Sequence, residues 1–236
     1  MGAVHCDMTP RILIFDFDGT LADTMPQLVD ALIDTIGDRL GGDELQRREQ
    51  VTRLLQLPPR EMFQAFAQLT GWQASEIQSK ARTMTARLPT RLFSEVPAVL
   101  NSLKQSGYLV VISSNNPDDS FGNRLAGVGL TNQYDIALGT DGDKGISKED
   151  HPRLAAERLG VQPDELAATG VFVGDLPGDM QLARSAGLLA IGRLTGANAD
   201  SLMAAGAQHV ITDLTELEPL LDSLSTATEI EIGNHS

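Results

Sequence analysis

Two aspartates stand one residue apart where an apolar stretch ends, in RILIFDFDGTLADT, residues 11–24. Asp16 and Asp18 flank Phe17 and follow a run that is typical of a buried strand. If the strand continues that far, both carboxylates point to the same side. Two neighbouring buried anions are costly unless a proton or a metal ion intervenes. Gly19 lets the backbone turn sharply beside a bound group, so we interpret this strand end as a chemical site.

A second apolar run also ends in acids. In TGVFVGDLPGDMQLARSAG, Asp175 follows the run directly and Asp179 comes four positions later. Asp175 matches Asp16 in its place at a strand end, and the carboxyl ends of parallel strands meet at one edge of a sheet. Three or four carboxylates form an all-oxygen site, which favours a hard cation and Mg²⁺ first. Asp179 could instead be only the N-cap of a helix.

A third strand end carries hydroxyl groups in place of acids. LVVISSNN stops at Ser113 and Ser114, and hydroxyl and amide donors suit phosphate oxygens, although an ordinary turn has the same composition. An anionic substrate also needs local positive charge, because the chain has a net charge of −14. Lys144 and Lys148, in GDKGISKEDHPRLAAERLG, could each supply it, or be ordinary surface lysines.

Five or six short apolar runs are expected to be the strands that position these residues. They are RILIFDF, YLVVISS, YDIALGT, TGVFVGD, LLAIGRL and QHVITD. Helical segments lie between them and stop at glycines such as Gly107, Gly160 and Gly187. The alternation predicts an α/β fold with a doubly wound, mainly parallel sheet.

One long stretch interrupts this alternation. From Leu21 to Arg91 the sequence contains only amphipathic helical patterns, and the stretch is too long for a loop. We predict an all-helical domain over residues 21–91, the helical insert, placed at the carboxyl edge of the sheet. Residues 1–20 and 92–225 would form the α/β core. Residues 226–236 are expected to be a loose C-terminal tail.

Composition narrows the class of protein. The hydrophobic fraction of 42% in 236 residues suits a soluble globular chain. No apolar run approaches the roughly 20 residues that cross a bilayer, and the N-terminus lacks the pattern of a signal peptide. We therefore expect a cytoplasmic protein with no membrane partner. The net charge of −14 opposes binding to nucleic acid.

Four segments together resemble the motifs of the haloacid dehalogenase-like hydrolases, Mg²⁺-dependent phosphatases with an aspartate nucleophile. These segments are DFDGTLADT, VISSN, SKEDHPRLAAERLG and VFVGDLPGD. The helical insert is similar to the α-helical cap of the phosphoglycolate-phosphatase-like members. The resemblance spans nearly the whole chain and implies a Rossmann-like core.

The resemblance also implies roles for individual residues. Asp16 would be the nucleophile that forms an aspartyl-phosphate, and Asp18 would be the general acid and base. The implied Mg²⁺ ligands are Asp16, the backbone carbonyl of Asp18, Asp175 and Asp179, the last directly or through water. The implied phosphate-binding residues are Ser113, with Ser114 as the alternative, Lys148, Gly19 and Thr20. Lys148 is preferred to Lys144 because it stands just before the HPRLAAERLG helix, although Glu149 follows it where many relatives have proline.

The expected function is hydrolysis of a small phosphorylated metabolite by a monomer or homodimer, with phosphoglycolate or a sugar phosphate as the nearest substrates. Asp18 favours phosphate esters over halides, because an oxygen leaving group needs a proton and a halide does not. Two alternatives stay open. One is a phosphomutase on the same scaffold, and the other is a non-catalytic regulatory protein that binds metal and phosphate.

Overall fold

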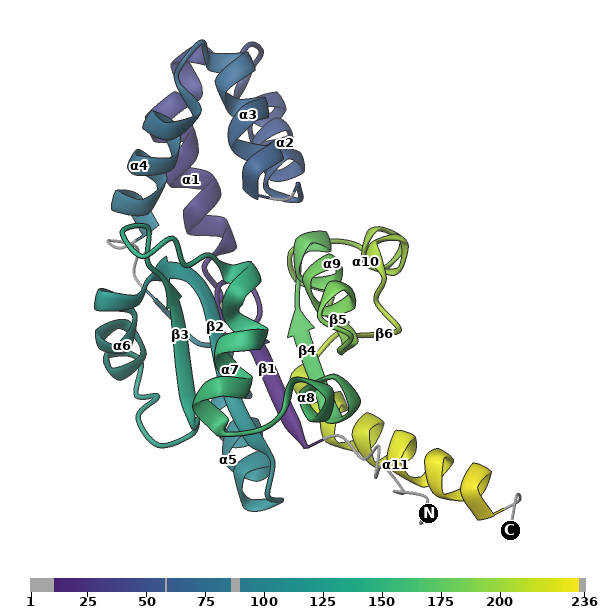
Figure 1. The fold of residues 1–236 in the computed structure, drawn as a ribbon. Coiled ribbons are helices and arrows are strands. Elements are labelled where there is room, and N and C mark those ends of the chain that lie inside the picture. The colour runs from purple at the N-terminus through teal and green to yellow at the C-terminus, as the bar shows by residue number, and fades with distance from the viewer. Residues whose placement is uncertain (1–10, 58, 86–89, 234–236) are drawn as a thin grey trace.

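A computed structural model describes residues 11–57, 59–85 and 90–233. Its six strands form one sheet in the order β3-β2-β1-β4-β5-β6, and every neighbouring pair is parallel. The strands are β1 (Ile12–Asp16), β2 (Leu109–Pro117), β3 (Ile136–Thr140), β4 (Gly170–Gly174), β5 (Leu189–Arg193) and β6 (His209–Ile211). The predicted doubly wound parallel sheet is confirmed (Figure 1).

Helices cover both faces of the sheet, which explains why its central strands are apolar throughout. In β1, Leu13 and Phe15 belong to one hydrophobic cluster, and Ile12 and Ile14 to the other. The first cluster includes side chains of α5 (Val96–Gln105), α6 (Asp118–Gly127) and α11 (Leu217–Gly233). The second includes those of α7 (His151–Leu159), α8 (Pro163–Thr169), α9 (Pro177–Ser185) and α10 (Ala199–Ala205).

The strand order reverses beside β1. From β1 the chain builds β2 and β3 on one side, then returns to place β4, β5 and β6 on the other. Such a switch point opens a crevice at the carboxyl ends of the strands, where ligands of doubly wound sheets bind. Asp16 ends β1 and is paired in register with Ser113 of β2, and β4 ends at Gly174, just before Asp175. The topology therefore brings all three predicted strand ends to one place.

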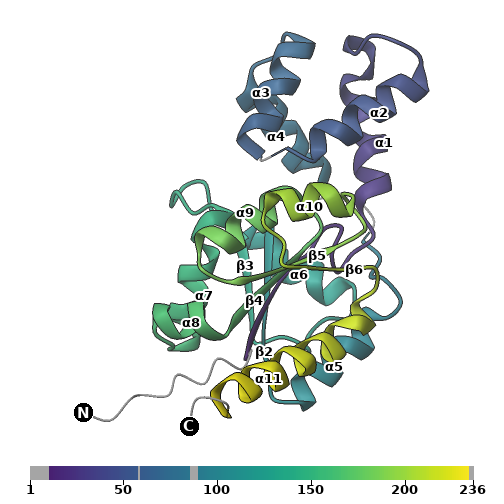
Figure 2. The same ribbon diagram turned by 90° about the vertical axis from the view of Figure 1, so that its right-hand side faces the viewer.

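The helical insert follows β1 and consists of α1 (Met25–Ile36), α2 (Glu44–Leu55), α3 (Pro59–Thr70) and α4 (Ala74–Thr85), with the 3₁₀ turn η1 (Gly37–Arg39). It has its own hydrophobic cluster, which includes Leu32, Val51 and Phe66. Figures 1 and 2 show it standing beyond the edge of the sheet to which the strands point. An insert of helices at this edge was predicted, and its domain bounds at residues 21 and 91 stay a prediction.

Two linkers that lie side by side connect the insert to the core. The outgoing linker is residues 21–24 and the return linker is residues 90–95. The amide of Asp23 donates to the carbonyl of Arg91 at 2.8 Å, and the amide of Phe93 donates to the carbonyl of Leu21 at 3.1 Å. Both linkers therefore meet the core at the same point, next to the end of β1.

The C-terminal segment differs from the expectation of a loose tail. Helix α11 runs to Gly233, after the 3₁₀ turn η3 (Leu214–Glu216), so most of residues 226–236 are helical. The sequence from 226 to 232 contains neither glycine nor proline, so nothing in it stops the helix before Gly233. Residues 234–236 lie outside the described part of the chain.

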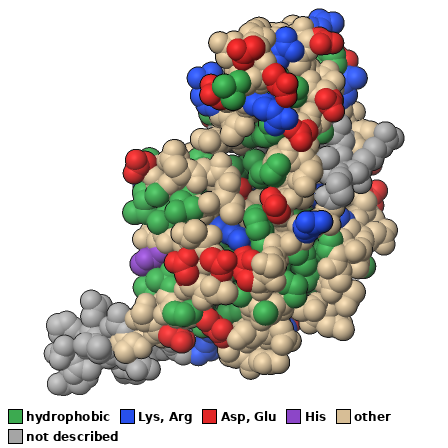
Figure 3. All heavy atoms as spheres, turned by 180° about the vertical axis from the view of Figure 1, so that it is seen from behind, with side chains coloured by type: hydrophobic (Ala, Val, Ile, Leu, Met, Phe, Trp, Pro, Cys, Tyr) green, Lys and Arg blue, Asp and Glu red, His purple; other side chains and the backbone are tan. Residues whose placement is uncertain are grey.

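The surface carries charged side chains of both signs, in a chain whose net charge is −14. Figure 3 shows Lys and Arg side chains interspersed with acidic ones over the insert, and acidic side chains gathered on the core below it. Among the described helices, none combines the length and the apolar character needed to span a bilayer.

Candidate active site

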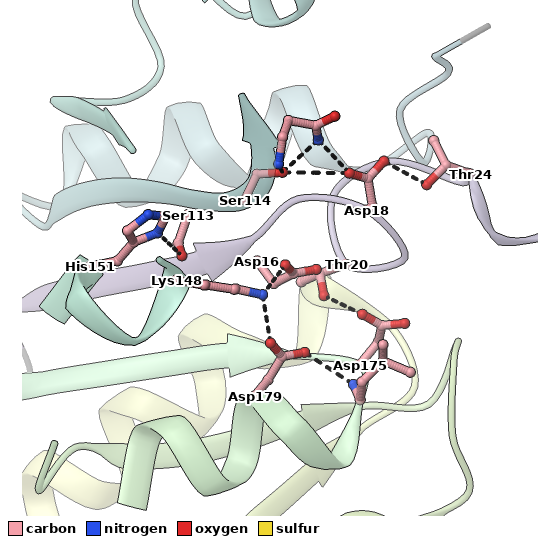
Figure 4. Close-up of polar contacts among 12 residues, drawn as sticks. Asp16, Asp18, Thr20, Thr24, Ser113, Ser114, Lys148, His151, Asp175 and Asp179 are labelled. Carbon is pink, nitrogen blue, oxygen red and sulfur yellow. Dashed lines mark hydrogen bonds and ion pairs between the residues drawn. The ribbon is translucent and has the colours of Figure 1, made fainter. Parts of the chain in front are cut away.

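Three carboxylates converge at the switch point. Asp16, Asp175 and Asp179 are buried, and each places a carboxylate oxygen within 4.8 Å of the other two (Figure 4). Asp16 ends β1, Asp175 follows β4, and Asp179 lies in the first turn of α9. Residues from distant parts of the sequence thus form one acidic cluster, as the strand-end argument predicted.

Asp175 is the most enclosed of the three. Its Oδ1 accepts a hydrogen bond of 3.0 Å from the hydroxyl of Thr20, whereas its Oδ2 is buried and has no hydrogen-bond partner in the part of the chain that the structure describes. A Cβ atom added to Gly19 would lie 2.2 Å from Oδ2, and one added to Gly196 would lie 2.0 Å from it. Burial, with the charges of Asp16 and Asp179, raises the pKa of Asp175 well above its usual range. A side chain at position 19 or 196 would clash with Oδ2 of Asp175, so glycine is required at both positions.

Lys148 places its ammonium group between two of these acids. It forms ion pairs with Asp16 and, at 2.6 Å, with Oδ1 of Asp179. Burial alone would lower the pKa of Lys148, but the two carboxylates outweigh it and raise the pKa. The ammonium group is therefore charged, and it offsets part of the repulsion within the cluster.

Burial and the neighbouring charges together shift the pKa of Asp16. Burial raises the pKa of Asp16 to about 7, and the charge of Asp179 adds to this while Lys148 opposes it. A divalent cation would instead favour the ionised carboxylates. Three buried carboxylates and one oxygen without a donor, with no His or Cys ligand joining them among the described residues, fit a hard cation such as Mg²⁺. Asp16, Asp175 and Asp179 are the side chains that would hold it.

Asp18 faces a different set of partners. Its carboxylate accepts hydrogen bonds from Thr24 at 2.9 Å, from Asn116 at 2.6 Å and from Arg124 at 2.9 Å. Ser114 adds a longer contact of 3.5 Å. In Figure 4 this carboxylate is turned toward Ser114 and Thr24, while that of Asp16 is turned toward Lys148. The two acids of the first motif therefore have separate environments.

The two serines of β2 also differ. Ser113 and His151 are both completely buried, and the hydroxyl of Ser113 lies 2.8 Å from Nδ1 of His151. The other ring nitrogen lies 3.1 Å from the carbonyl oxygen of Gly139. Burial lowers the pKa of His151 to about 4, and the charge of Lys148 contributes. The ring is thus neutral, its Nε2–H donating to Gly139 and its Nδ1 accepting from Ser113.

Residues 13–192 match the family described as "Haloacid dehalogenase-like hydrolase", which is more than half of the chain. The chain belongs to the haloacid dehalogenase-like hydrolase family.

Relatives of this family member match it over most of their length. It is 28% identical over 220 residues to "Probable phosphatase IndB" of Dickeya dadantii, covering 87% of the chain and 91% of that protein. It is 26% identical over 231 residues to "Phosphoglycolate phosphatase" of Pectobacterium atrosepticum, covering 92% and 94%. Among solved structures, "a predicted phosphatase from Clostridium acetobutylicum" has a TM-score of 0.73 at 23% identity, over 90% and 99% of the two chains. That likeness supports the fold.

The structure of this hydrolase separates the residues that the sequence left as alternatives. Lys148 lies inside the acidic cluster, whereas Lys144 is largely exposed and pairs with Asp141 at 2.8 Å. Ser114 lies on the side of Asp18, and Ser113 is engaged by His151. The sequence-based roles themselves stay predictions.

Sequence reasoning missed three residues that contact Asp18. They are Thr24, Asn116 and Arg124. Asn116 could have been suspected, because it follows the serines at the end of β2. Arg124 lies in the middle of α6 and carries no local signal, since only the packing of α6 against β2 brings it to the site.

Proposed function

We propose that the chain is a Mg²⁺-dependent phosphatase that hydrolyses a small phosphorylated metabolite through an aspartyl-phosphate on Asp16. The observation that carries this proposal is the placing of Asp16 at the switch point, beside Lys148 and two further buried carboxylates. The names of the relatives, a probable phosphatase and a phosphoglycolate phosphatase, support the reaction class.

Each step of the proposed reaction uses groups of this chain. An oxygen of Asp16 attacks phosphorus while the bond from phosphorus to the leaving oxygen breaks, and Asp18 gives its proton to that oxygen. A water molecule then attacks phosphorus, Asp18 takes a proton from it, and the bond between Asp16 and phosphorus breaks. Phosphate is released, and both carboxyl groups return to their starting states.

Charge and positioning supply most of what phosphoryl transfer requires. Lys148 would donate to the oxygens of the transferring group, from its position next to Asp16. Mg²⁺ bound by Asp16, Asp175 and Asp179 would supply positive charge against the repulsion between carboxylate and phosphoryl oxygens. We assign the phosphate-binding hydroxyl to Ser114, because the hydroxyl of Ser113 donates at 2.8 Å to the buried ring of His151, whereas that of Ser114 donates only to Asp18, at 3.5 Å. Gly19 and Thr20, in the turn after β1, would bind the phosphate through their backbone.

Phosphoglycolate, or a sugar phosphate of similar size, is the proposed substrate. The helical insert carries a surface cavity of about 530 Å³ with polar lining. Its lining residues are Gly41, Gly42, Gln46, Glu49, Gln50 and Arg53. Arg53 is the cation among them and Glu49 the anion, so the lining carries one charge of each sign. Cytoplasmic location and a monomeric or homodimeric state stay predictions from the sequence.

A phosphate-release screen over phosphorylated metabolites, with purified protein and Mg²⁺, tests this function. We expect turnover of at least one small phosphomonoester and its loss in Asp16→Asn, which removes the nucleophile but preserves the shape of the side chain. Retained activity in that variant would contradict the assignment of the nucleophile. Transfer of the phosphoryl group to a second hydroxyl of the substrate, with little free phosphate, would indicate a phosphomutase. Undetectable turnover across the panel would favour a non-catalytic protein.

A further inference from the structure

Arg124 makes two hydrogen bonds to Asp18, more than any other described residue. Its side chain is 11% exposed, and Nη2 donates to Oδ1 of Asp18 at 2.9 Å, while Nη1 lies 3.4 Å from Oδ2. The guanidinium group therefore faces both oxygens of one carboxylate. Such a fork restricts a carboxylate in orientation as well as in position, which the single ammonium of a lysine does not do.

The other contacts of Arg124 hold the guanidinium itself in place. Nη1 donates to Oδ1 of Asn116 at 2.6 Å, and the amide group of Asn116 donates to Asp18 at 2.6 Å. The guanidinium carbon lies 5.2 Å from the ring centre of Phe17, the residue between the two aspartates. Asn116 is buried, and so is Phe17. Arg124, Asn116 and Asp18 therefore form a closed triangle of hydrogen bonds above an aromatic ring.

The remaining nitrogen of Arg124 reaches the return linker. Nε donates to the hydroxyl of Thr90 at 2.8 Å. On the outgoing linker, the hydroxyl of Thr24 donates to Asp18 at 2.9 Å. Asp18 is thus bound by one linker directly and by the other through Arg124. The position of this carboxylate depends on both connections to the helical insert.

We propose that Arg124 is a positioning residue that orients Asp18 for proton transfer and couples it to the return linker through Thr90. This inference rests on the proposed function, in which Asp18 protonates the leaving oxygen and later deprotonates water. Arg124 is not assigned any contact with the phosphoryl group. Its effect on the reaction passes through Asp18.

Two substrates with different leaving groups test the inference. In a two-step mechanism, kcat/KM reports only the steps up to departure of the leaving group. A nitrophenyl phosphate releases an anion that needs little protonation, whereas an alkyl phosphate needs a proton from Asp18. We expect Arg124→Met to lower kcat/KM for the alkyl ester on the order of 100-fold, and for the nitrophenyl ester by much less. Equal losses on both substrates would overturn the proposal.

A double-mutant cycle gives a second, independent readout. If Arg124 acts through Asp18, Arg124→Met should cause no further loss in an Asp18→Asn background. A loss of the same size in both backgrounds would show that Arg124 acts elsewhere. Arg153→Met is the matched control, because Arg153 is 56% exposed on α7 and pairs with Glu157, away from the site. It should leave kcat/KM unchanged for both esters.

Two further variants keep the test decisive if methionine disturbs folding at position 124. Arg124→Lys retains the charge but cannot bridge Asp18, Asn116 and Thr90 at once. Thr90→Val removes only the link to the return linker. Both should lower the ratio of alkyl to nitrophenyl kcat/KM while the far-UV circular dichroism spectrum stays unchanged. An unchanged ratio in both variants would refute the inference, whereas absence of wild-type turnover on any ester would refute the proposed phosphatase function instead.

Discussion

The hydroxyl of Thr20 donates a hydrogen bond of 3.0 Å to Oδ1 of Asp175, and Oδ2 of the same carboxylate is buried with no donor among residues 11–57, 59–85 and 90–233. One oxygen thus fixes the side chain, and the other is left for a ligand from outside the chain. Because Asp16 and Asp179 lie within 4.8 Å, a divalent cation would relieve the repulsion among all three. The stability of the protein should therefore depend on Mg²⁺.

Asp175→Asn should remove this dependence. At a Mg²⁺ concentration of about 100 times its dissociation constant, binding stabilises a folded chain by about 2.7 kcal/mol, which raises Tm by several degrees for a chain of this size. We expect that rise in the wild-type protein by thermal unfolding, and its absence in the variant. A chelator should abolish wild-type activity, and Mg²⁺ should restore it. An equal rise in Tm for both proteins would place the metal elsewhere.

Lys148→Met and Lys144→Met form a matched pair. Lys148 contacts Asp16 and Asp179 in the buried cluster, whereas the side chain of Lys144 is 72% exposed. Removing a positioned donor to the transferring group costs on the order of 100-fold to 1,000-fold in kcat. We expect that loss in phosphate release for Lys148→Met and wild-type kcat for Lys144→Met. The opposite pattern would assign the phosphate-binding role to Lys144.

Substitution of the two adjacent serines of β2 should have different effects, one mainly on the free energy of unfolding and the other mainly on kcat/KM. Ser113→Ala leaves Nδ1 of His151 buried without its partner, which costs about 1–3 kcal/mol of unfolding free energy. Ser114→Ala removes the hydroxyl that we assign to phosphate, so kcat/KM should fall. It also removes an acceptor from Asn116, whose side-chain amide still donates to Asp18, so the loss of stability should be smaller than in Ser113→Ala. Urea unfolding and phosphate release, measured on both variants, check the two effects. A loss of activity confined to Ser113→Ala would reverse the assignment.

The sheet and the acidic cluster could be predicted from the sequence because both follow from local patterns. Apolar runs in β1 and β4 mark strands buried on both faces, and the acid after each run marks its carboxyl end. Parallel pairing then brings Asp16 and Asp175 together without further information. The insert was recognisable for a similar reason, since helical periodicity replaces strand patterns from Leu21 onward.

The surroundings of Asp18 were not predictable in the same way. Arg124 and Thr90 are separated by 34 positions and meet only because α6 packs beside the return linker. The contacts of His151 could not be predicted from the sequence either. A histidine at the start of a helix is usually solvated, and only the tertiary contact with Ser113 and Gly139 shows that its ring is buried. Contacts of this kind depend on three-dimensional packing, which a pattern of residue types does not encode.

The buried ring of His151 predicts that stability decreases as pH falls. Its pKa is about 4 in the folded chain, against an ordinary value of 6.5, so the unfolded chain binds more protons between these values. The stabilisation is fully present above pH 6.5 and is lost progressively toward pH 4. Each unit of pKa difference between the folded and unfolded chains corresponds to about 1.4 kcal/mol. The stabilisation that depends on neutral His151 is therefore roughly 3 kcal/mol.

The matched variant for this prediction is His151→Gln, which can still donate to the carbonyl of Gly139 and accept from Ser113 but does not titrate. Its free energy of unfolding in urea, measured from pH 7.5 to pH 4.5, should fall less steeply than that of the wild-type protein. The difference between the two curves isolates the imidazole, because the carboxylates of the acidic cluster titrate in both chains. Parallel curves would show that the ring of His151 is free to take up a proton in the folded protein.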